Sequence, residues 1–138
     1  MATNYRELIV WQRAMALAES VYLVAATLPA VERFGLSAQL RRAAVSVPSN
    51  IAEGHERRSR AEYRRFVAIA CGSLAKLETQ LELAQRIYRD LDADGLKNAM
   101  ELADQTGRLL RAIERKLRPS DTVKTAVMRQ PSALSPQL

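Results

Sequence analysis

The sequence is poor in the residues that usually build metal, disulfide and catalytic sites. Its 138 residues include one cysteine, Cys71, and one histidine, His55. A lone cysteine cannot form an internal disulfide, and a lone histidine excludes a His-rich zinc site and the paired Glu-x-x-His motifs of a di-iron bundle. No nucleophile is paired with a base. We therefore expect a non-enzymatic protein without metal or cofactor, and the single thiol is typical of a cytoplasmic location.

Glycine, proline and aromatic residues are also scarce, and no long hydrophobic run is present. There are 5 glycines and 5 prolines, and aromatics make up 5% of a chain that is 48% hydrophobic. This balance favours helices over a turn-rich β fold. The most apolar early stretch, residues 14–18, is far shorter than the roughly 20 apolar residues that span a membrane. We expect an all-α protein with no membrane segment and no signal peptide.

Capping residues and apolar periodicity predict four helices in one domain. The helices are expected from Tyr5 to Leu28, from Ser37 to Gly54, from Ser59 to Asp90 and from Asp92 to Arg118. Asn4 and Ser59 are each followed three residues later by glutamate, which is the spacing of a capping box. Long helices with short connections predict an antiparallel up-down-up-down bundle over residues 1–118. Residues 119–138 contain further prolines and no sustained apolar period, so we expect a flexible C-terminal tail.

Gly54, Gly72 and Pro48 interrupt the pattern of the expected second and third helices. Pro48 is expected to bend the second helix without ending it, and Asn50 to satisfy backbone groups that the proline frees. Gly54 is expected to end that helix. Gly72 within the third helix costs about 1 kcal/mol relative to alanine, which predicts the close approach of another helix.

The first helix is apolar over an unusually wide arc, with two apolar stripes side by side. A helix of this kind usually needs more cover than its own bundle provides. We therefore predict a contact between subunits of a homo-oligomer. The residues assigned to this contact are Val10, Trp11, Ala14, Leu17 and Val21.

Positive charge is in excess and is concentrated near the expected second turn. Lys and Arg number 21 against 15 acids, which gives a net charge of +6, a sequence pI near 10.0 and a preference for anionic partners. The predicted nucleic-acid contacts are Arg57, Arg58, Arg60, Arg64 and Arg65, with Arg41 and Arg42 upstream. Cations are disfavoured at a helix start, and a bound phosphate would offset that penalty. We expect RNA or DNA backbone as the ligand.

Other interpretations of the same residues remain open. The turn arginines can pair in a solvated turn with three neighbouring glutamates, Glu53, Glu56 and Glu62. Arg41 and Arg42 can cover apolar surface with their stems, or pair with a neighbouring subunit. Tyr63 and Phe66 are expected in the core, so the sequence predicts backbone binding without base stacking.

The sequence resembles a known bacterial family. The resemblance is carried by residues 34–54, by Val10-Trp11-Gln12, and by the segments 72–74 and 77–81, and it covers roughly residues 8–117. These motifs are similar to those of 23S rRNA intervening sequence proteins, which are four-helix bundles. Similar proteins include the accessory variability proteins of diversity-generating retroelements. That resemblance implies a basic homopentamer that associates with nucleic acid and with a reverse transcriptase. A protein-interaction scaffold, accessory to such a polymerase, is the alternative function.

Overall fold

The computed structural model describes residues 4–119, and within that range the chain is all-helical. The four long helices are α1 (Ile9–Ala26), α2 (Leu36–Glu56), α3 (Arg60–Ile87) and α4 (Ala93–Leu117), and two short 3-10 helices are η1 (Tyr5–Glu7) and η2 (Ala30–Glu32). The all-α prediction with four helices is therefore confirmed, and α3, with 28 residues, is the longest of them. Most of the expected tail lies outside the described residues.

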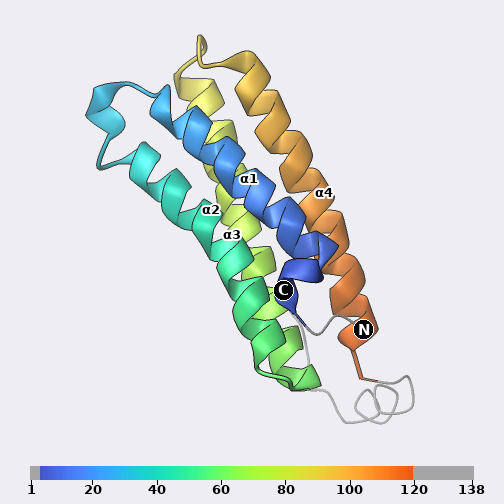
Figure 1. The fold of residues 1–138 in the computed structure, drawn as a ribbon. Helices are drawn as coiled ribbons and strands as arrows, with labels where there is room; N and C mark the ends of the chain where they lie inside the picture. Colours follow the sequence, from blue (N-terminus) through green and yellow to red (C-terminus); the bar gives the residue numbers. More distant parts are fainter. Residues whose placement is uncertain (1–3, 120–138) are drawn as a thin grey trace, which may run out of the picture.

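The four helices lie side by side in one bundle (Figure 1). α1 packs against α2 and α4, and α3 packs against the same two helices. The α2–α3 connection lies at one end of the bundle, whereas the α1–α2 and α3–α4 connections lie at the other end (Figure 1). We refer to the end that carries the α2–α3 connection as the basic end, for the charges described below.

The predicted capping box at Asn4 is present, but it caps η1 rather than a long first helix. The Asn4 side chain accepts a hydrogen bond from the Arg6 amide, and the Glu7 carboxylate accepts one from the Asn4 amide. Leu8 then adopts an extended conformation, with φ −73° and ψ 126°, so α1 begins only at Ile9. The expected helix from Tyr5 is thus broken after one turn.

The start of α2 differs from the sequence prediction. Ser37 does not cap the helix, because its hydroxyl lies inside the bundle and donates to the carbonyl of Ala25 at 3.2 Å. Glu32 replaces it, since its carboxylate accepts a hydrogen bond from the Leu36 amide at 3.0 Å. The Tyr88 hydroxyl also donates to Glu32. One carboxylate therefore joins the α1–α2 connection to the end of α3.

The other two helix starts are as predicted. The Ser59 hydroxyl accepts from the Glu62 amide at 3.3 Å, and the Asp92 carboxylate accepts from the Gly95 amide at 3.0 Å. Each bond satisfies one of the four backbone amides that have no partner within their own helix.

The core is built from the inward faces of all four helices. On α2 four apolar residues at helical spacing, Leu40, Ala44, Val47 and Ile51, are all fully buried. α2 continues through Pro48, as expected. Asn50, however, donates to the carbonyl of Ser46 rather than to a group that the proline frees.

Four of the five residues predicted for the subunit contact lie inside the bundle instead. Val10, Ala14, Leu17 and Val21 are at most 2% exposed, because α2 and α4 already cover them. Trp11 is half-buried and meets the Tyr5 ring edge-on, with 5.4 Å between ring centroids. The apolar side chains that α1 leaves exposed are Ile9, Met15, Tyr22 and Leu23.

Neither Gly54 nor Gly72 has the role that the sequence suggested for it. Gly54 does not end α2, which continues to Glu56; it is buried, and a Cβ built on it would lie 2.6 Å from the Cβ of Phe66 on α3. A Cβ on Gly72 would meet nothing within 4 Å. Close helix approach therefore occurs at Gly54, and the expectation for Gly72 is wrong.

Candidate nucleic-acid interface

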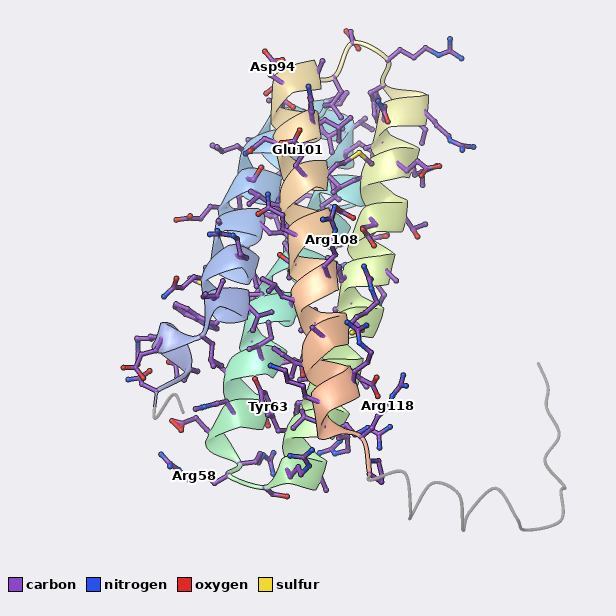
Figure 2. All side chains as sticks on the ribbon, turned by 90° about the vertical axis from the view of Figure 1, so that its right-hand side faces the viewer. Arg58, Tyr63, Asp94, Glu101, Arg108 and Arg118 are labelled. Carbon is purple, nitrogen blue, oxygen red and sulfur yellow. The ribbon has the colours of Figure 1, made fainter. Side chains whose placement is uncertain are left out.

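The ends of the bundle differ in charge. The basic end comprises residues 4–8, 53–66 and 112–119, which hold nine Lys and Arg against five Glu, a net charge of +4. The opposite end, residues 27–36 and 86–98, has four cations and four acids. Figure 2 shows Arg58 and Arg118 at one end of the bundle and Asp94 at the other. Positive potential is thus concentrated where α2 and α4 end and α3 begins.

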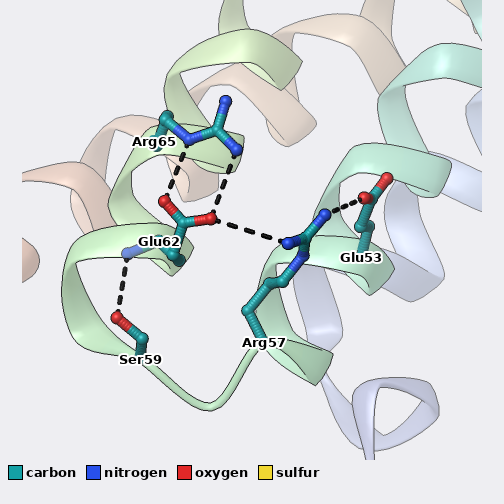
Figure 3. A network of polar contacts seen from close by, with 5 residues as sticks. All are labelled: Glu53, Arg57, Ser59, Glu62 and Arg65. Atoms are coloured by element: carbon teal, nitrogen blue, oxygen red, sulfur yellow. Dashed lines mark hydrogen bonds and ion pairs between the residues drawn. The ribbon is translucent and has the colours of Figure 1, made fainter.

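Two arginines of the basic end share one glutamate across the α2–α3 turn. Glu62 lies 3.0 Å from Arg65 and 3.8 Å from Arg57, and Arg57 also pairs with Glu53 at 2.7 Å (Figure 3). Both guanidinium groups lie over the ring of Phe66, at 5.1 and 4.5 Å from its centroid. The aromatic face and the carboxylates hold the two guanidiniums in place while leaving them about half exposed.

Two further arginines connect the start of α3 to the end of α4. Arg64 pairs with Glu114 at 3.2 Å, and Arg60 donates to the backbone carbonyl of Lys116. Arg118 also pairs with Glu114, at 2.9 Å. Arg60 satisfies a carbonyl in the last turn of α4, where the helix dipole favours a cation. These side chains stabilise the bundle as well as adding charge.

Three other cations of the basic end, Arg58, Arg115 and Lys116, donate no side-chain hydrogen bond within residues 4–119. Arg58 has a left-handed backbone, with φ 55°, its side chain is 71% exposed, and its nearest carboxylate, Glu56, is 3.8 Å away. Arg115 and Lys116 are exposed, and within residues 4–119 their side chains make no hydrogen bond or ion pair. The turn arginines do pair with glutamates, as the alternative interpretation expects. Exposed pairs of this kind are weak, and the net charge of +4 remains.

Tyr63 is not fully in the core, unlike Phe66. It is half-buried and lines a hollow of about 460 Å³ at the basic end, together with His55, Arg58 and Leu117. The rings of Tyr63 and His55 meet edge-on at 5.8 Å, and burial raises the pKa of the Tyr63 hydroxyl. The hollow gives the basic end a concave, partly aromatic surface beside exposed guanidinium groups.

Arg41 and Arg42 do not join this cluster. Arg42 lies 15 residues before Arg57 on α2, a distance of about 22 Å at 1.5 Å per residue. Successive residues of a helix point about 100° apart, so the two neighbouring arginines face different sides of α2. Arg41 is half-buried, whereas Arg42 is exposed and lines a groove between α2 and α3.

The described part of the chain has no arrangement typical of a metal centre or a reactive thiol. Between residues 4 and 119 no group of three or more His, Cys, Asp or Glu is placed to hold a metal ion. Cys71 is half-buried against the core, and burial raises the pKa of its thiol. None of the helices in this range is both long and apolar enough to cross a membrane.

Comparison with known proteins decides the family. Residues 6–112 match the 23S rRNA-intervening sequence protein family. The chain belongs to this family. Its fold is similar to that of a protein of unknown function from the S23 ribosomal protein family of Bacteroides thetaiotaomicron VPI-5482, solved by crystallography at 1.70 Å resolution. The two chains are 23% identical with a TM-score of 0.68, covering 77% of this chain and 98% of the other, which shows a shared fold. None of the curated proteins matches the chain.

Part of the basic end of this 23S rRNA-intervening sequence family protein was not predicted from its sequence. No role in nucleic-acid binding was assigned to Arg115, Lys116 or Arg118 from the sequence. The packing of α4 against α3 brings them beside Arg60 and Arg64. The signal was available in the sequence: these cations lie at the end of the fourth predicted helix. In an up-down-up-down bundle that end lies beside the start of the third helix.

Acidification is expected to destabilise the bundle through the carboxylates that hold its connections. Hydrogen bonds from Arg65 to Glu62, from Arg118 to Glu114 and from Tyr88 to Glu32 lower the pKa of each carboxyl below its ordinary value near 4.5. A lowered folded-state pKa stabilises the protein above the unfolded-state pKa, and this stability is lost as pH falls through the folded value.

The expected Tm is therefore nearly constant above about pH 5.5 and falls progressively below about pH 4.5. Thermal denaturation followed by circular dichroism between pH 7 and pH 3 measures it. Glu114→Gln removes one of the contributing carboxyls, so its Tm should fall less over the same range. A Tm that rises on acidification would contradict this account.

Proposed function

We propose that this protein is a non-enzymatic, antiparallel up-down-up-down four-helix bundle that assembles into a homo-oligomer and binds the backbone of RNA or DNA through its basic end. The observation that carries the proposal is the net charge of +4 at that end, against zero at the other. Guanidinium forks suit phosphate oxygens in geometry and charge. The family name refers to ribosomal RNA, which is compatible with this ligand class.

Assembly would multiply this basic surface. Ile9, Ala16 and Leu23 recur every seven residues along α1, and Ile9 and Leu23 are 59% and 71% exposed. Met15 and Tyr22 are also exposed, roughly 100° around the helix from this stripe. This outer face, rather than the buried inner stripe, is the face that we assign to the subunit contact, and a pentamer is the expected assembly. Several weak basic patches in one ring can bind one polyanion with high avidity.

The test of nucleic-acid binding uses the cations that are not needed for folding. Arg58, Arg115 and Lys116 donate no side-chain hydrogen bond within the described bundle, so replacing all three with glutamine should leave the fold intact. If each binds one phosphate, the triple variant should bind an oligonucleotide about 10²–10³-fold more weakly at low salt. Filter binding or fluorescence anisotropy measures this loss.

A matched control removes the same charge from the other end. Arg33, Arg89 and Lys97 are exposed and form no ion pair within residues 4–119. Their triple glutamine variant should bind within about twofold of the wild type, because charges beyond about 10 Å are largely screened. Equal losses in both variants would mean that net charge, and not the basic end, determines binding.

A protein-interaction scaffold is the second candidate. It is favoured by two strongly exposed apolar side chains in the α1–α2 connection, Val31 and Phe34, which lie away from the basic end. Apolar side chains in such positions are available to a protein partner, for which a reverse transcriptase is the proposed example. A pull-down that survives nuclease treatment and is lost in Phe34→Ser would support this function.

A further inference from the structure

A second basic site lies in a groove between α2 and α3, away from the basic end. The groove has a volume of about 510 Å³ and lies over two turns of each helix. It is lined by Gln39, Arg42, Ala43 and Ser46 of α2 and by Ser73, Lys76 and Gln80 of α3. Six of these seven side chains are polar, and none is acidic.

The two cations of this groove are not neutralised by the protein. Within residues 4–119 neither Arg42 nor Lys76 forms an ion pair or a side-chain hydrogen bond. Most arginines of the basic end, in contrast, pair with a glutamate. Two like charges that line one hollow repel each other, and a bound anion would remove that repulsion.

The neighbouring side chains add hydrogen-bond donors. The hydroxyls of Ser46 and Ser73 lie 2.8 Å apart, and Asn50 donates to the Ser46 hydroxyl at 2.9 Å. Of the two hydroxyl protons, one makes the serine–serine bond, so the other remains to be donated to a ligand.

Gln80 also lines the groove, and its side-chain amide carries two further donor hydrogens. Its Oε1 is buried and has no hydrogen-bond partner in the described part of the chain. Guanidinium, ammonium, hydroxyl and amide donors without a carboxylate are the donor set of a phosphate site.

We infer that the α2–α3 groove binds a phosphate group, and that in this protein the phosphate is a phosphodiester of the nucleic acid held at the basic end. The inference rests on the proposed function for the source of the phosphate. Arg42 lies about 22 Å along α2 from Arg57, and α2 and α3 lie side by side between them (Figure 1). A nucleic-acid strand along this seam contacts the groove and the turn arginines together.

The experiment compares two double variants of the full chain with the same change in charge. Arg42→Gln with Lys76→Gln removes the groove cations, and Arg89→Gln with Lys97→Gln removes two exposed, unpaired cations elsewhere. Fluorescence anisotropy with one single-stranded 20-nucleotide RNA, and with the DNA of the same sequence, measures affinity at several salt concentrations. Circular dichroism checks that each variant is folded.

The groove variant should bind each oligonucleotide about a hundredfold more weakly, at about tenfold per cation. Its log–log salt slope should be smaller in magnitude by about 1.4, since each phosphate contact on a single strand contributes about 0.7. The control variant should bind within twofold of the wild type. Unchanged affinity and slope in the groove variant, with the basic-end variant weakened, would overturn the inference and leave the proposed function standing.

A second arm separates the phosphate site from nucleic-acid binding. Inorganic phosphate is titrated into isotope-labelled protein, and the amide signals of Ser46, Ser73 and the Gln80 side chain are followed by NMR. Saturable shifts in the wild type that vanish in the groove variant support a phosphate site, even if no oligonucleotide binds and the proposed function fails. Phosphate shifts without any effect of the groove variant on oligonucleotide affinity would assign the site to a free phosphate ligand and overturn the phosphodiester assignment. Absence of such shifts would overturn the site.

Discussion

Replacing Gly54 with leucine is expected to lower the free energy of unfolding by about 3 kcal/mol, which corresponds to a fall in Tm of roughly 10–15 °C. Gly54 is buried in α2, and even a Cβ would lie 2.6 Å from the Cβ of Phe66 and 3.3 Å from the ring of Tyr63. The Phe66 Cβ is fixed to the backbone of α3 and cannot rotate away. A larger side chain must therefore push α2 and α3 apart just where the turn arginines are held.

Gly72→Leu is the matched control for this prediction. A Cβ at Gly72 meets nothing within 4 Å, and the residue is exposed in the middle of α3. Leucine is a better helix former than glycine, so this variant should be more stable by about 0.5–1 kcal/mol. Chemical denaturation of the wild type, Gly54→Leu and Gly72→Leu measures both changes in the free energy of unfolding. A similar loss in the two variants would mean that Gly72, and not only Gly54, lies against another helix or subunit.

The second large effect concerns assembly. Ile9→Glu combined with Leu23→Glu is expected to convert the proposed homo-oligomer to a monomer, because two charges would then be buried without partners in the proposed α1 contact. Both side chains are mostly exposed in the single chain, so the bundle itself should remain folded. The molar mass measured by light scattering should fall from about 77 kDa, which is five chains of 15.4 kDa, to the mass of one chain.

Val45→Glu serves as the control for assembly. Val45 is also exposed and apolar, but it lies on α2 rather than on the outer face of α1. This variant should keep the mass of the wild type. A wild type that is monomeric at working concentration, or a double variant that keeps its full mass, would contradict the assignment of the α1 face.

The helical periodicity was enough to predict the fold, because it depends on local spacing. Leu40, Ala44, Val47 and Ile51 recur on one face of α2, and this face is buried. The cap at Asp92 could be predicted for the same reason, since an N-cap residue binds backbone amides in the first turn of the helix that it caps. The break at Leu8 and the partner of Ser37 depend on tertiary contacts, which local spacing does not contain.

The inner and outer faces of α1 show where sequence reasoning ends. Two adjacent apolar stripes indicate that much of the helix is covered, but they do not tell which neighbour covers each stripe. α2 and α4 bury Val10 and Leu17, so the side chains left exposed are Ile9 and Leu23. Close helix approach was assigned to Gly72 instead of Gly54 for the same reason, because it depends on how α2 and α3 pair.

The candidate site was predicted only in part. The turn arginines are close in sequence, and their clustering is visible without a structure. Arg42 and Lys76 are 34 residues apart, and they line one groove only because α2 and α3 run past each other with Ser46 opposite Ser73. The groove also lacks acids, a property that becomes visible only when both helices are placed.

The most direct test of the central claim is the salt dependence of nucleic-acid binding by the full chain. The three cations of the basic end that donate no side-chain hydrogen bond, Arg58, Arg115 and Lys116, and the two in the groove give five phosphate contacts, which predict a log–log slope of about −3.5 for a single strand. Affinity should fall roughly a hundredfold between 50 and 200 mM salt. Failure to retain RNA or DNA at 50 mM salt, or a slope near zero, would contradict the claim that this bundle binds polyanions through its exposed cations.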